Sequence, residues 1–251
     1  MLPFAVHVLC VVPARLGSTR LPRKPLRLLA GEPLVRLVAR RVLELDLGPV
    51  VVAADDCQVL EAVASLGVEG VLTSPNHRCG TERVAEVARL PRYAQMDMVL
   101  NVQGDEPFVA VEAAVGAVHR VRIGDPVGTA AAPLRAEDVA ELHRVKVVVD
   151  RAGHALRFSR AFPASGAWPC EVQVMQHIGV YAYSKQALLR WAALRPVPEE
   201  LEEGLEQLRP LAYGITVGVA EVGAPPLPGI DTEADLARAE AYMDSVSQRV
   251  G

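Results

Sequence analysis

The stretch VHVLCVVPARLGSTRLPRKP, residues 6–25, indicates the fold class of this 251-residue chain. Apart from His7, its first seven residues are apolar, and four of them are valine, which is typical of a buried strand. A polar loop over residues 13–25 follows directly and combines small residues with four basic ones. Ligands of open α/β sheets bind outside the carboxyl ends of the strands. The stretch therefore predicts an α/β protein with an anion-binding loop after its first strand.

The rest of the chain continues the α/β pattern, because short β-branched runs alternate with helical periodicity. Strands are expected over 50–54, 68–73, 98–102, 127–133, 145–149, 155–158, 174–183 and 215–219, and helices over 33–45, 55–66, 82–90, 185–194 and 199–208. Asp55 and Asp56 are expected to cap one helix, and Thr232-x-x-Asp235 forms a capping box for a last helix that begins near Asp231. The turn 150–153 predicts a hairpin. We expect one domain over 1–251 with a mixed sheet, in which 145–183 forms a strand-rich subdomain.

Composition excludes several classes of protein. The net charge of −4 and the pI of about 5.9 argue against a nucleic-acid binder. No apolar run approaches the roughly 20 residues that span a membrane. Residues 1–12 lack a basic start and read as a strand and not as a signal peptide. Without a C-x-x-C pair, the scattered cysteines predict neither disulfides nor zinc and favour the reducing cytoplasm: Cys10, Cys57, Cys79 and Cys170.

The first loop contains neither the P-loop motif nor G-x-G-x-x-G, which disfavours a P-loop kinase and a simple dinucleotide binder. Its small residues let backbone N–H groups approach an anion, and basic side chains supply charge. The chain has 23 arginines and only three lysines, so Lys24 stands against the bias. We expect Arg15, Arg20 and Lys24 to contact phosphate, whereas Arg23 and Arg27 read as solvated surface residues.

Acidic residues after a later strand predict a metal site. Asp105 follows a glycine in NVQGDEP, residues 101–107, at the carboxyl end of a buried strand. Mg²⁺ is usually held by one or two carboxylates together with substrate phosphates and water. Asp231 is the candidate second ligand, and its alternative role is that of a helix N-cap. Glu106 is a further candidate, although Pro107 is expected to turn it away.

In this order, the motifs resemble those of the 3-deoxy-manno-octulosonate cytidylyltransferases, which make CMP-Kdo. The resemblance covers nearly the whole chain through Pro13-Ala14-Arg15, Ser18-Thr19-Arg20-Leu21-Pro22, Lys24-Pro25, His77, Gly80-Thr81-Glu82-Arg83, Asn101-Val102-Gln103-Gly104-Asp105-Glu106-Pro107, Val145-Lys146-Val147-Val148, Phe158-Ser159-Arg160-Ala161, His177-Ile178-Gly179-Val180-Tyr181-Ala182-Tyr183, Leu205-Glu206-Gln207-Leu208-Arg209 and Asp231-Thr232.

This resemblance implies a three-layer, Rossmann-like α/β nucleotidyltransferase fold with a mixed sheet and a small dimerising subdomain. It also implies a cytoplasmic homodimer that transfers CMP from CTP to the anomeric hydroxyl of 3-deoxy-D-manno-octulosonate (Kdo), with Mg²⁺, for lipopolysaccharide-type glycan synthesis. The implied catalytic residues are Arg15, Lys24 and Asp105, and the implied metal ligands are Asp105 and Asp231. The implied nucleotide-binding residues are Ala14, Arg15, Arg20, Lys24, Ser74, Gly80 and Gln103. The implied residues for the acidic sugar are Gln103, Arg160, His177, Tyr181, Glu206 and Gln207.

An anionic sugar needs Arg or His for its carboxylate, and we expect Arg160 and a partly charged His177 to serve it. The alternatives are a packed strand for His177 and Tyr181 and an exposed helix face for Glu206 and Gln207. Departures from the family pattern concern the sugar side more than the triphosphate side: Ala54, Cys79, Arg144, Gln176, Pro210, Ala212 and the short segment 162–175.

Two other functions stay open at this point. One is a cytidylyltransferase for another sugar acid, either sialic-acid-like or a modified octulosonate. The other is a CTP-binding protein without turnover, which the pair of candidate metal carboxylates disfavours. The expected homodimer rests on the strands of 145–183, together with Phe162 and Trp168 in a loop that one domain would struggle to bury.

Overall fold

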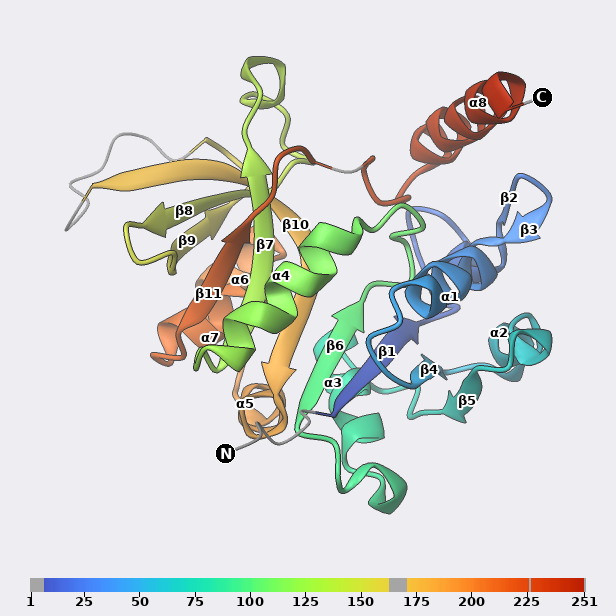
Figure 1. The fold of residues 1–251 in the computed structure, drawn as a ribbon, viewed down its shortest axis with the longest axis horizontal. Coiled ribbons are helices and arrows are strands. Elements are labelled where there is room, and N and C mark those ends of the chain that lie inside the picture. Colours follow the sequence, from blue (N-terminus) through green and yellow to red (C-terminus); the bar gives the residue numbers. More distant parts are fainter. Residues whose placement is uncertain (1–6, 163–170, 226, 251) are drawn as a thin grey trace. The chain divides into compact units, whose positions relative to one another are not determined.

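The computed structural model describes residues 7–162, 171–225 and 227–250, and the chain divides into two compact units. Of the described residues, the N-terminal unit comprises 7–95, 101–109 and 227–250, and the central unit comprises 96–100, 110–162 and 171–225 (Figure 1). Within the described residues, no helix is both long enough and apolar enough to cross a membrane. The single domain and the dimerising subdomain expected from the sequence stay predictions. The predicted homodimer rested partly on two loop residues, Phe162 and Trp168. Phe162 is 47% exposed, and Trp168 lies outside the described residues.

Parallel strands form the sheet of the N-terminal unit. Strand β1 (Val8–Ala14) pairs with β4 (Val50–Ala54), which pairs with β5 (Glu69–Leu72). Every residue of β1 and β4 is buried, which explains their unbroken apolar sequences. Because the three strands are parallel, the loops that follow them emerge at the same edge of the sheet. The first loop, predicted to bind anions, lies at this edge.

Helices of the N-terminal unit follow the predicted positions with two corrections. Helix α1 (Leu34–Glu44) agrees with the prediction, and α3 (Gly80–Ala88) begins two residues early. The helix expected over 55–66 is wrong in length, because α2 (Cys57–Glu61) ends early and a separate 3₁₀ turn η2 (Ala64–Leu66) follows. Two further 3₁₀ turns are η1 (Lys24–Leu26) and η3 (Pro91–Tyr93).

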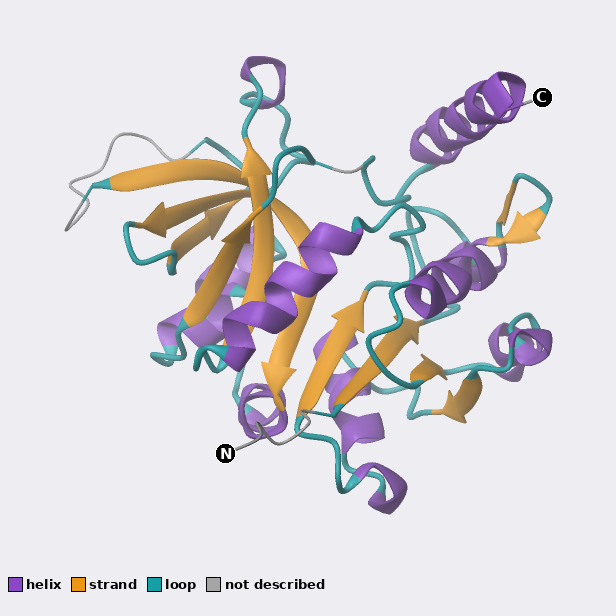
Figure 2. Ribbon diagram, viewed as in Figure 1, coloured by secondary structure: helices purple, strands orange, loops and turns teal. Residues whose placement is uncertain are grey.

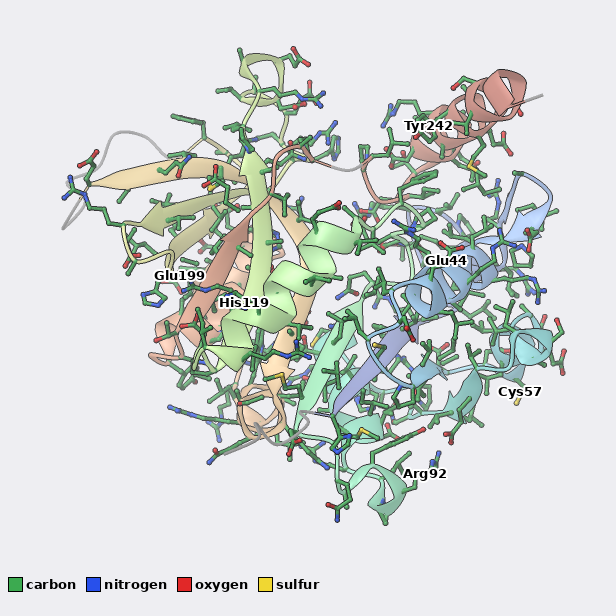
Figure 3. All side chains as sticks on the ribbon, viewed as in Figure 1. Glu44, Cys57, Arg92, His119, Glu199 and Tyr242 are labelled. Atoms are coloured by element: carbon green, nitrogen blue, oxygen red, sulfur yellow. The ribbon has the colours of Figure 1, made fainter. Side chains whose placement is uncertain are left out.

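The C-terminal helix α8 (Glu233–Val250) starts at the predicted capping box. The Thr232 hydroxyl accepts a hydrogen bond from the Asp235 N–H at 3.2 Å, and the Asp235 carboxylate accepts one from the Thr232 N–H at 2.8 Å. The helix contacts the small hairpin of β2 (Leu28–Leu29) and β3 (Glu32–Pro33). Tyr242, labelled in Figure 3, packs edge-on against Phe108.

The central unit contains the mixed sheet that the sequence predicts. Strand β10 (Val172–Ser184) pairs antiparallel with β7 (Val127–Pro133) and with β8 (Lys146–Asp150), while β11 (Val217–Glu221) runs parallel to β7. β6 (Met98–Val102), of which residues 98–100 belong to this unit, lies beside β10 (Figure 2). The predicted hairpin joins β8 to β9 (Ala155–Ser159), and the Asp150 carboxylate accepts hydrogen bonds from the N–H groups of Ala152 and His154 in its turn.

Helix α4 (Val111–Arg122) was not anticipated from the sequence. Its buried residues recur at helical spacing and are small: Ala113, Ala114, Ala117, Val118 and Val121. The helix packs on β7, β10 and β11. A Cβ at Gly128 of β7 would lie 2.0 Å from the Ala117 carbonyl oxygen, so glycine is required for the backbones to approach this closely. Close packing of small residues, and not a strong amphipathic pattern, holds this helix.

A single helix over 199–208 was expected, and this is wrong. Helix α6 (Pro198–Glu203) ends at Gly204, whose φ of +64° lies in the left-handed region, and α7 (Leu208–Ala212) follows. The buried Arg209 guanidinium bonds both carboxylate oxygens of Glu200, with Nε–Oε2 at 2.8 Å, and so holds the two short helices together. The loop between them carries Glu206. A short η4 (Ala136–Asp138) and α5 (Lys185–Ala193) complete the unit.

Candidate active site

The loop after β1 keeps its basic side chains at the surface because an apolar residue anchors it. Leu21 is fully buried, whereas Arg15 and Arg20 are exposed and Ala14 ends the buried strand. The two arginines predicted to lie at the surface pair there, Arg23 with Gln58 at 2.7 Å and Arg27 with Glu233. Arg15 and Arg20 thus remain accessible to an anion.

Lys24 is the centre of the charged cluster in the N-terminal unit. Its Nζ lies 2.5 Å from Asp105 Oδ2 and 2.8 Å from Asp231 Oδ1, and Arg20 lies 3.0 Å from Asp231 Oδ2. Burial lowers the pKa of Lys24, but the two carboxylates outweigh it and raise the pKa above its usual value. The ammonium therefore stays charged at neutral pH. Four of the predicted residues meet here.

Close backbone packing places Asp105 and Asp231 beside each other. A Cβ at Gly104 would lie 2.7 Å from the Pro13 carbonyl oxygen, so only glycine allows the turn to approach the end of β1. The Ile230 N–H donates to the Asp105 carbonyl at 2.9 Å and fixes the segment before α8 on this turn. The alternative role of Asp231 as an N-cap is wrong, because its neighbour Thr232 caps α8.

Glu106 belongs to the same cluster, which corrects the expectation that Pro107 would turn it away. Gly229 leaves the space for it, since a Cβ there would lie 2.7 Å from Glu106 Oε1. Burial, together with the negative charges of Asp105 and Asp231, raises the pKa of Glu106 to about 8. A third carboxyl group therefore lies at the site and is largely protonated at neutral pH.

The arrangement of Asp105 and Asp231 fits a hard cation. Both carboxylates direct an oxygen at one point, which Lys24 Nζ marks. Among the described residues no group of three or more Asp, Glu, His or Cys side chains is disposed to hold a metal ion. Two carboxylates that leave positions open for phosphate oxygens and water match the usual binding of Mg²⁺.

The segment 74–81 is held by two glutamates of α3 that sequence reasoning did not single out. Glu86 accepts hydrogen bonds from the Ser74 N–H at 3.0 Å and from the His77 ring, and Glu82 accepts from the Arg78 N–H at 2.9 Å. At the end of the segment, a Cβ at Gly80 would lie 3.1 Å from Gln103 Oε1. Of the nucleotide-binding residues predicted here, Gly80 and Gln103 are adjacent, whereas Ser74 lies at the other end of the segment.

In the central unit, Arg160 is held on three sides. Its N–H donates to the Glu203 carboxylate at 3.1 Å, and its Nε donates to the Glu203 carbonyl at 2.8 Å. Its carbonyl accepts from the fully buried Lys146 ammonium at 2.9 Å. The sequence did not predict a role for Glu203. Lys146 is one of only three lysines in an arginine-rich chain and was therefore easier to notice. The anchored backbone fixes where the Arg160 side chain begins.

His177 and Tyr181 lie together in an aromatic cluster, with ring centroids 5.4 Å apart. Burial lowers the pKa of His177 well below its usual range, so the ring is neutral at pH 7 and the expectation of a partly charged histidine is wrong. The Thr129 hydroxyl lies 2.9 Å from His177 Nε2 and 2.7 Å from the Val180 carbonyl. Since that hydroxyl has one proton to donate to the carbonyl, it accepts from His177, and this leaves Nδ1 as an acceptor.

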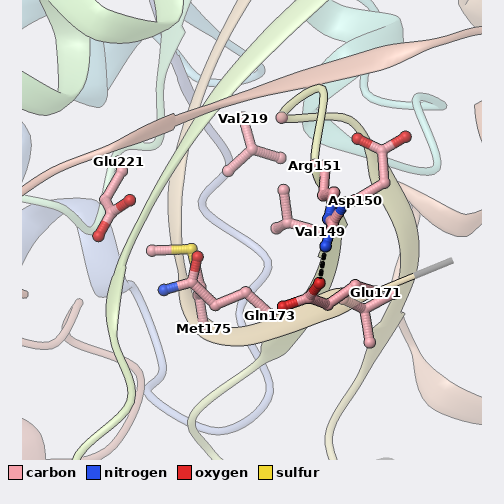
Figure 4. A pocket seen from close by; sticks show the side chains of 10 residues that line it. Val149, Asp150, Arg151, Glu171, Gln173, Met175, Val219 and Glu221 are labelled. Carbon is pink, nitrogen blue, oxygen red and sulfur yellow. Dashed lines mark hydrogen bonds and ion pairs between the residues drawn. The ribbon is translucent and has the colours of Figure 1, made fainter.

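Glu206 is close enough to this cluster for its charge to act on Tyr181. Tyr181 is buried, and burial together with the charges of Tyr183 and Glu206 raises its pKa well above its usual value. Glu206 is partly exposed and Gln207 is buried, so an exposed helix face describes neither residue well. A cavity of about 440 Å³ elsewhere in the unit is lined by residues of β8, β10 and β11 and includes none of the predicted residues (Figure 4).

Comparisons with known proteins agree with this fold. The model of the cytidylyltransferase family matches residues 9–217. A 3-deoxy-manno-octulosonate cytidylyltransferase of Gemmatimonas aurantiaca is 51% identical over 94% of each chain. One of Rhodospirillum centenum is 45% identical, over 94% of this chain and 93% of its own.

Solved structures give the same result. A structure of CMP:2-keto-3-deoxy-manno-octonic acid synthetase complexed with CTP matches with a TM-score of 0.85 at 35% identity, over 95% of this chain and 99% of its own. A 4-diphosphocytidyl-2C-methyl-D-erythritol synthase of Anaerococcus prevotii shares the fold alone, with a TM-score of 0.62 at 13% identity, over 95% and 99%.

The fold is therefore that of the α/β nucleotidyltransferases, as the sequence predicted. The chain belongs to the cytidylyltransferase family, and within it to the 3-deoxy-manno-octulosonate cytidylyltransferases.

The raised pKa of Glu106 generates a prediction about pH and stability. The pKa is about 8 in the folded protein and 4.5 for an unperturbed glutamate, so between these values the folded state binds more protons than the unfolded state. The free energy of unfolding should therefore fall as pH rises through this window. Glu106→Gln removes the difference in proton binding. In metal-free buffer with chelator, urea midpoints should show the wild type losing stability relative to this variant from about pH 5 to about pH 8.

Glu137→Gln is the matched control, because the Glu137 side chain is 75% exposed. Its midpoints should run parallel to those of the wild type. Parallel curves for Glu106→Gln as well would show that the Glu106 carboxyl is ionised in the folded protein, contrary to the prediction.

Proposed function

We propose that this chain transfers CMP from CTP to the anomeric hydroxyl of Kdo, with Mg²⁺, and releases pyrophosphate for lipopolysaccharide-type glycan synthesis. The observation that carries the proposal is the convergence of Asp105 and Asp231 on the Lys24 ammonium, with Arg20 beside them. Relatives that carry the name of this activity are up to 51% identical over nearly the whole chain. The family match supports the reaction, and the cluster supports the place where it occurs.

In the proposed reaction the anomeric hydroxyl attacks the α-phosphorus of CTP in line with the departing pyrophosphate. Lys24, Arg15 and Arg20 would bind the triphosphate, and their charges would stabilise the negative charge that develops on the phosphate oxygens. Asp105 and Asp231 would hold Mg²⁺, which when bound supplies further neutralisation of that charge. Positioning and electrostatics then account for most of the acceleration.

On the sugar side, the carboxylate of Kdo would pair with the Arg160 guanidinium, whose backbone is fixed by Glu203 and Lys146. The neutral His177 is suited to accept a hydrogen bond from a sugar hydroxyl through Nδ1, and it brings no charge. Glu206, close enough to influence the Tyr181 hydroxyl, is suited to accept from a second hydroxyl.

The substrate panel tests this proposal directly. Pyrophosphate release is measured for CTP and UTP, each with Kdo and with a sialic acid. Because cytosine and uracil present different donors and acceptors at one ring edge, kcat/KM with Kdo should favour CTP by at least about 100-fold. Faster turnover of the sialic acid would support the other sugar-acid activity. CTP binding without release of its pyrophosphate in the presence of either sugar would support a non-catalytic protein.

Asp105→Asn tests the metal and triphosphate site. Loss of this carboxylate charge should lower kcat by at least about 100-fold at saturating Mg²⁺, as is typical of groups that stabilise charge in a transition state. The exposed Asp244 of α8 supplies the control, since Asp244→Asn changes the same formal charge far along the helix. Turnover of Asp105→Asn within a few-fold of the control would refute the assignment.

Arg160→Ala tests the sugar side. The KM for Kdo should rise by at least about tenfold through loss of a charge-assisted contact, while the Kd for CTP, measured by calorimetry without sugar, should stay nearly unchanged. Arg157→Ala is the matched control, because Arg157 is exposed and lies on β9, the strand that ends one residue before Arg160. If Arg160→Ala instead abolishes CTP binding and leaves the KM for Kdo intact, the assignment of Arg160 to the sugar is wrong.

A further inference from the structure

Asp55 and Asp56 follow β4 and were both expected to cap a helix, but they have different hydrogen-bond partners. Asp56 caps α2 and accepts a hydrogen bond from the Gln58 N–H at 2.8 Å. Asp55 instead accepts a hydrogen bond through Oδ1 from the Leu16 N–H at 2.9 Å. Leu16 directly follows Arg15 in the loop after β1. The Asp55 carboxylate therefore ties this loop to the carboxyl end of the neighbouring strand.

Asp55 is in turn held by Arg83 of α3. The Arg83 side chain is only 3% exposed, and its Nη2 lies 3.2 Å from Asp55 Oδ2. Its Nη1 contacts the Thr73 hydroxyl, which donates to the Ala54 carbonyl at 2.9 Å. One buried guanidinium thus joins α3 to residues that directly follow β4 and β5. Its place in the Gly80-Thr81-Glu82-Arg83 motif gave no indication of this role.

The charges of this pair matter because the loop binds an anion. A carboxylate beside the loop would repel a triphosphate if it were not compensated. Arg83 provides the compensation, and the Asp55 side chain is 14% exposed, so solvent does little to screen it. Burial lowers the pKa of Arg83, while the charge of Asp55 opposes this change. Arg15 is exposed and is close enough to Arg83 for their charges to repel.

We propose that Asp55 and Arg83 are positioning residues for CTP binding. Asp55 sets the backbone at Leu16 and thereby the direction in which Arg15 leaves the strand, and Arg83 both orients the carboxylate and neutralises it. Neither residue needs to touch the nucleotide. This inference rests on the proposed function in one respect: it takes the triphosphate of CTP as the anion that Arg15 binds.

Calorimetric titration of CTP with Mg²⁺ tests the pair. Asp55→Ala and Arg83→Met should each raise the Kd for CTP by at least about tenfold, because one frees the loop and the other leaves an uncompensated carboxylate beside it. The double variant Asp55→Asn/Arg83→Met should bind CTP at least about threefold more tightly than Arg83→Met alone. The amide oxygen still accepts from the Leu16 N–H, and no uncompensated charge remains beside the loop. The KM for the sugar should change much less than the KM for CTP.

Asp56→Ala is the matched control. It removes the neighbouring cap and should lower the urea midpoint while leaving the Kd for CTP unchanged. Far-UV circular dichroism verifies folding, and if Asp55→Ala does not fold, the comparison of Arg83→Met with the double variant decides. The proposal is overturned if Asp55→Ala binds CTP as the wild type does, or if the double variant binds no better than Arg83→Met.

The same series separates this inference from the proposed function. A wild type that makes CMP-Kdo, together with variants that retain its CTP affinity, contradicts the positioning role alone. A wild type that binds inorganic tripolyphosphate but neither binds nor turns over CTP contradicts the proposed function, and the affinity for tripolyphosphate across the variants then decides whether the pair positions the loop.

Discussion

The contact of the Lys24 ammonium with Asp105 and Asp231 is the interaction on which the site depends. It joins segments that are 81 and 207 residues from Lys24 in the sequence. Carboxylates that share a small space repel each other unless a cation lies between them, and burial together with the charges of Asp105 and Asp231 raises the pKa of Glu106 there. The triphosphate proposed to bind there would add more, which fits the exposed Arg15 and Arg20 and a site suited to a divalent cation.

Sheet geometry explains why residues remote in sequence reach this cluster. Strands β1, β4 and β5 are parallel, so the segments after them emerge together and can be cross-linked by side chains such as Asp55 and Arg83. The turn at Asp105 is fixed against the end of β1 because Gly104 has no Cβ to separate them. The apolar strands supply the rigid base, and the polar loops supply the chemistry.

Much of this could be predicted because it depends on local signals. The buried strand over 50–54, the capping box at Thr232 and the hairpin turn at Asp150 each have a signature within a few residues. The features that the sequence did not predict depend on packing between residues far apart in the chain. The small residues of α4 are explained by the close approach of this helix to Gly128 of β7. The position of Glu106 depends on Gly229, which is more than 120 residues away in the sequence. The different roles of Asp55 and Asp56 likewise follow from Leu16 and Arg83.

Among the residues predicted to bind the sugar, positive charge is limited to one side chain. Burial lowers the pKa of His177, so its ring is neutral and brings no positive charge to a carboxylate. Gln176, where the family resemblance leads one to expect an arginine, is 5% exposed, and its buried Oε1 has no hydrogen-bond partner among the described residues. Of the residues predicted to meet the sugar, Arg160 alone brings a positive charge. In the proposed pairing of Arg160 with the sugar carboxylate, the three hydrogen bonds that hold its backbone and Nε would favour binding, since a mobile arginine would lose entropy on pairing that a fixed one has already lost.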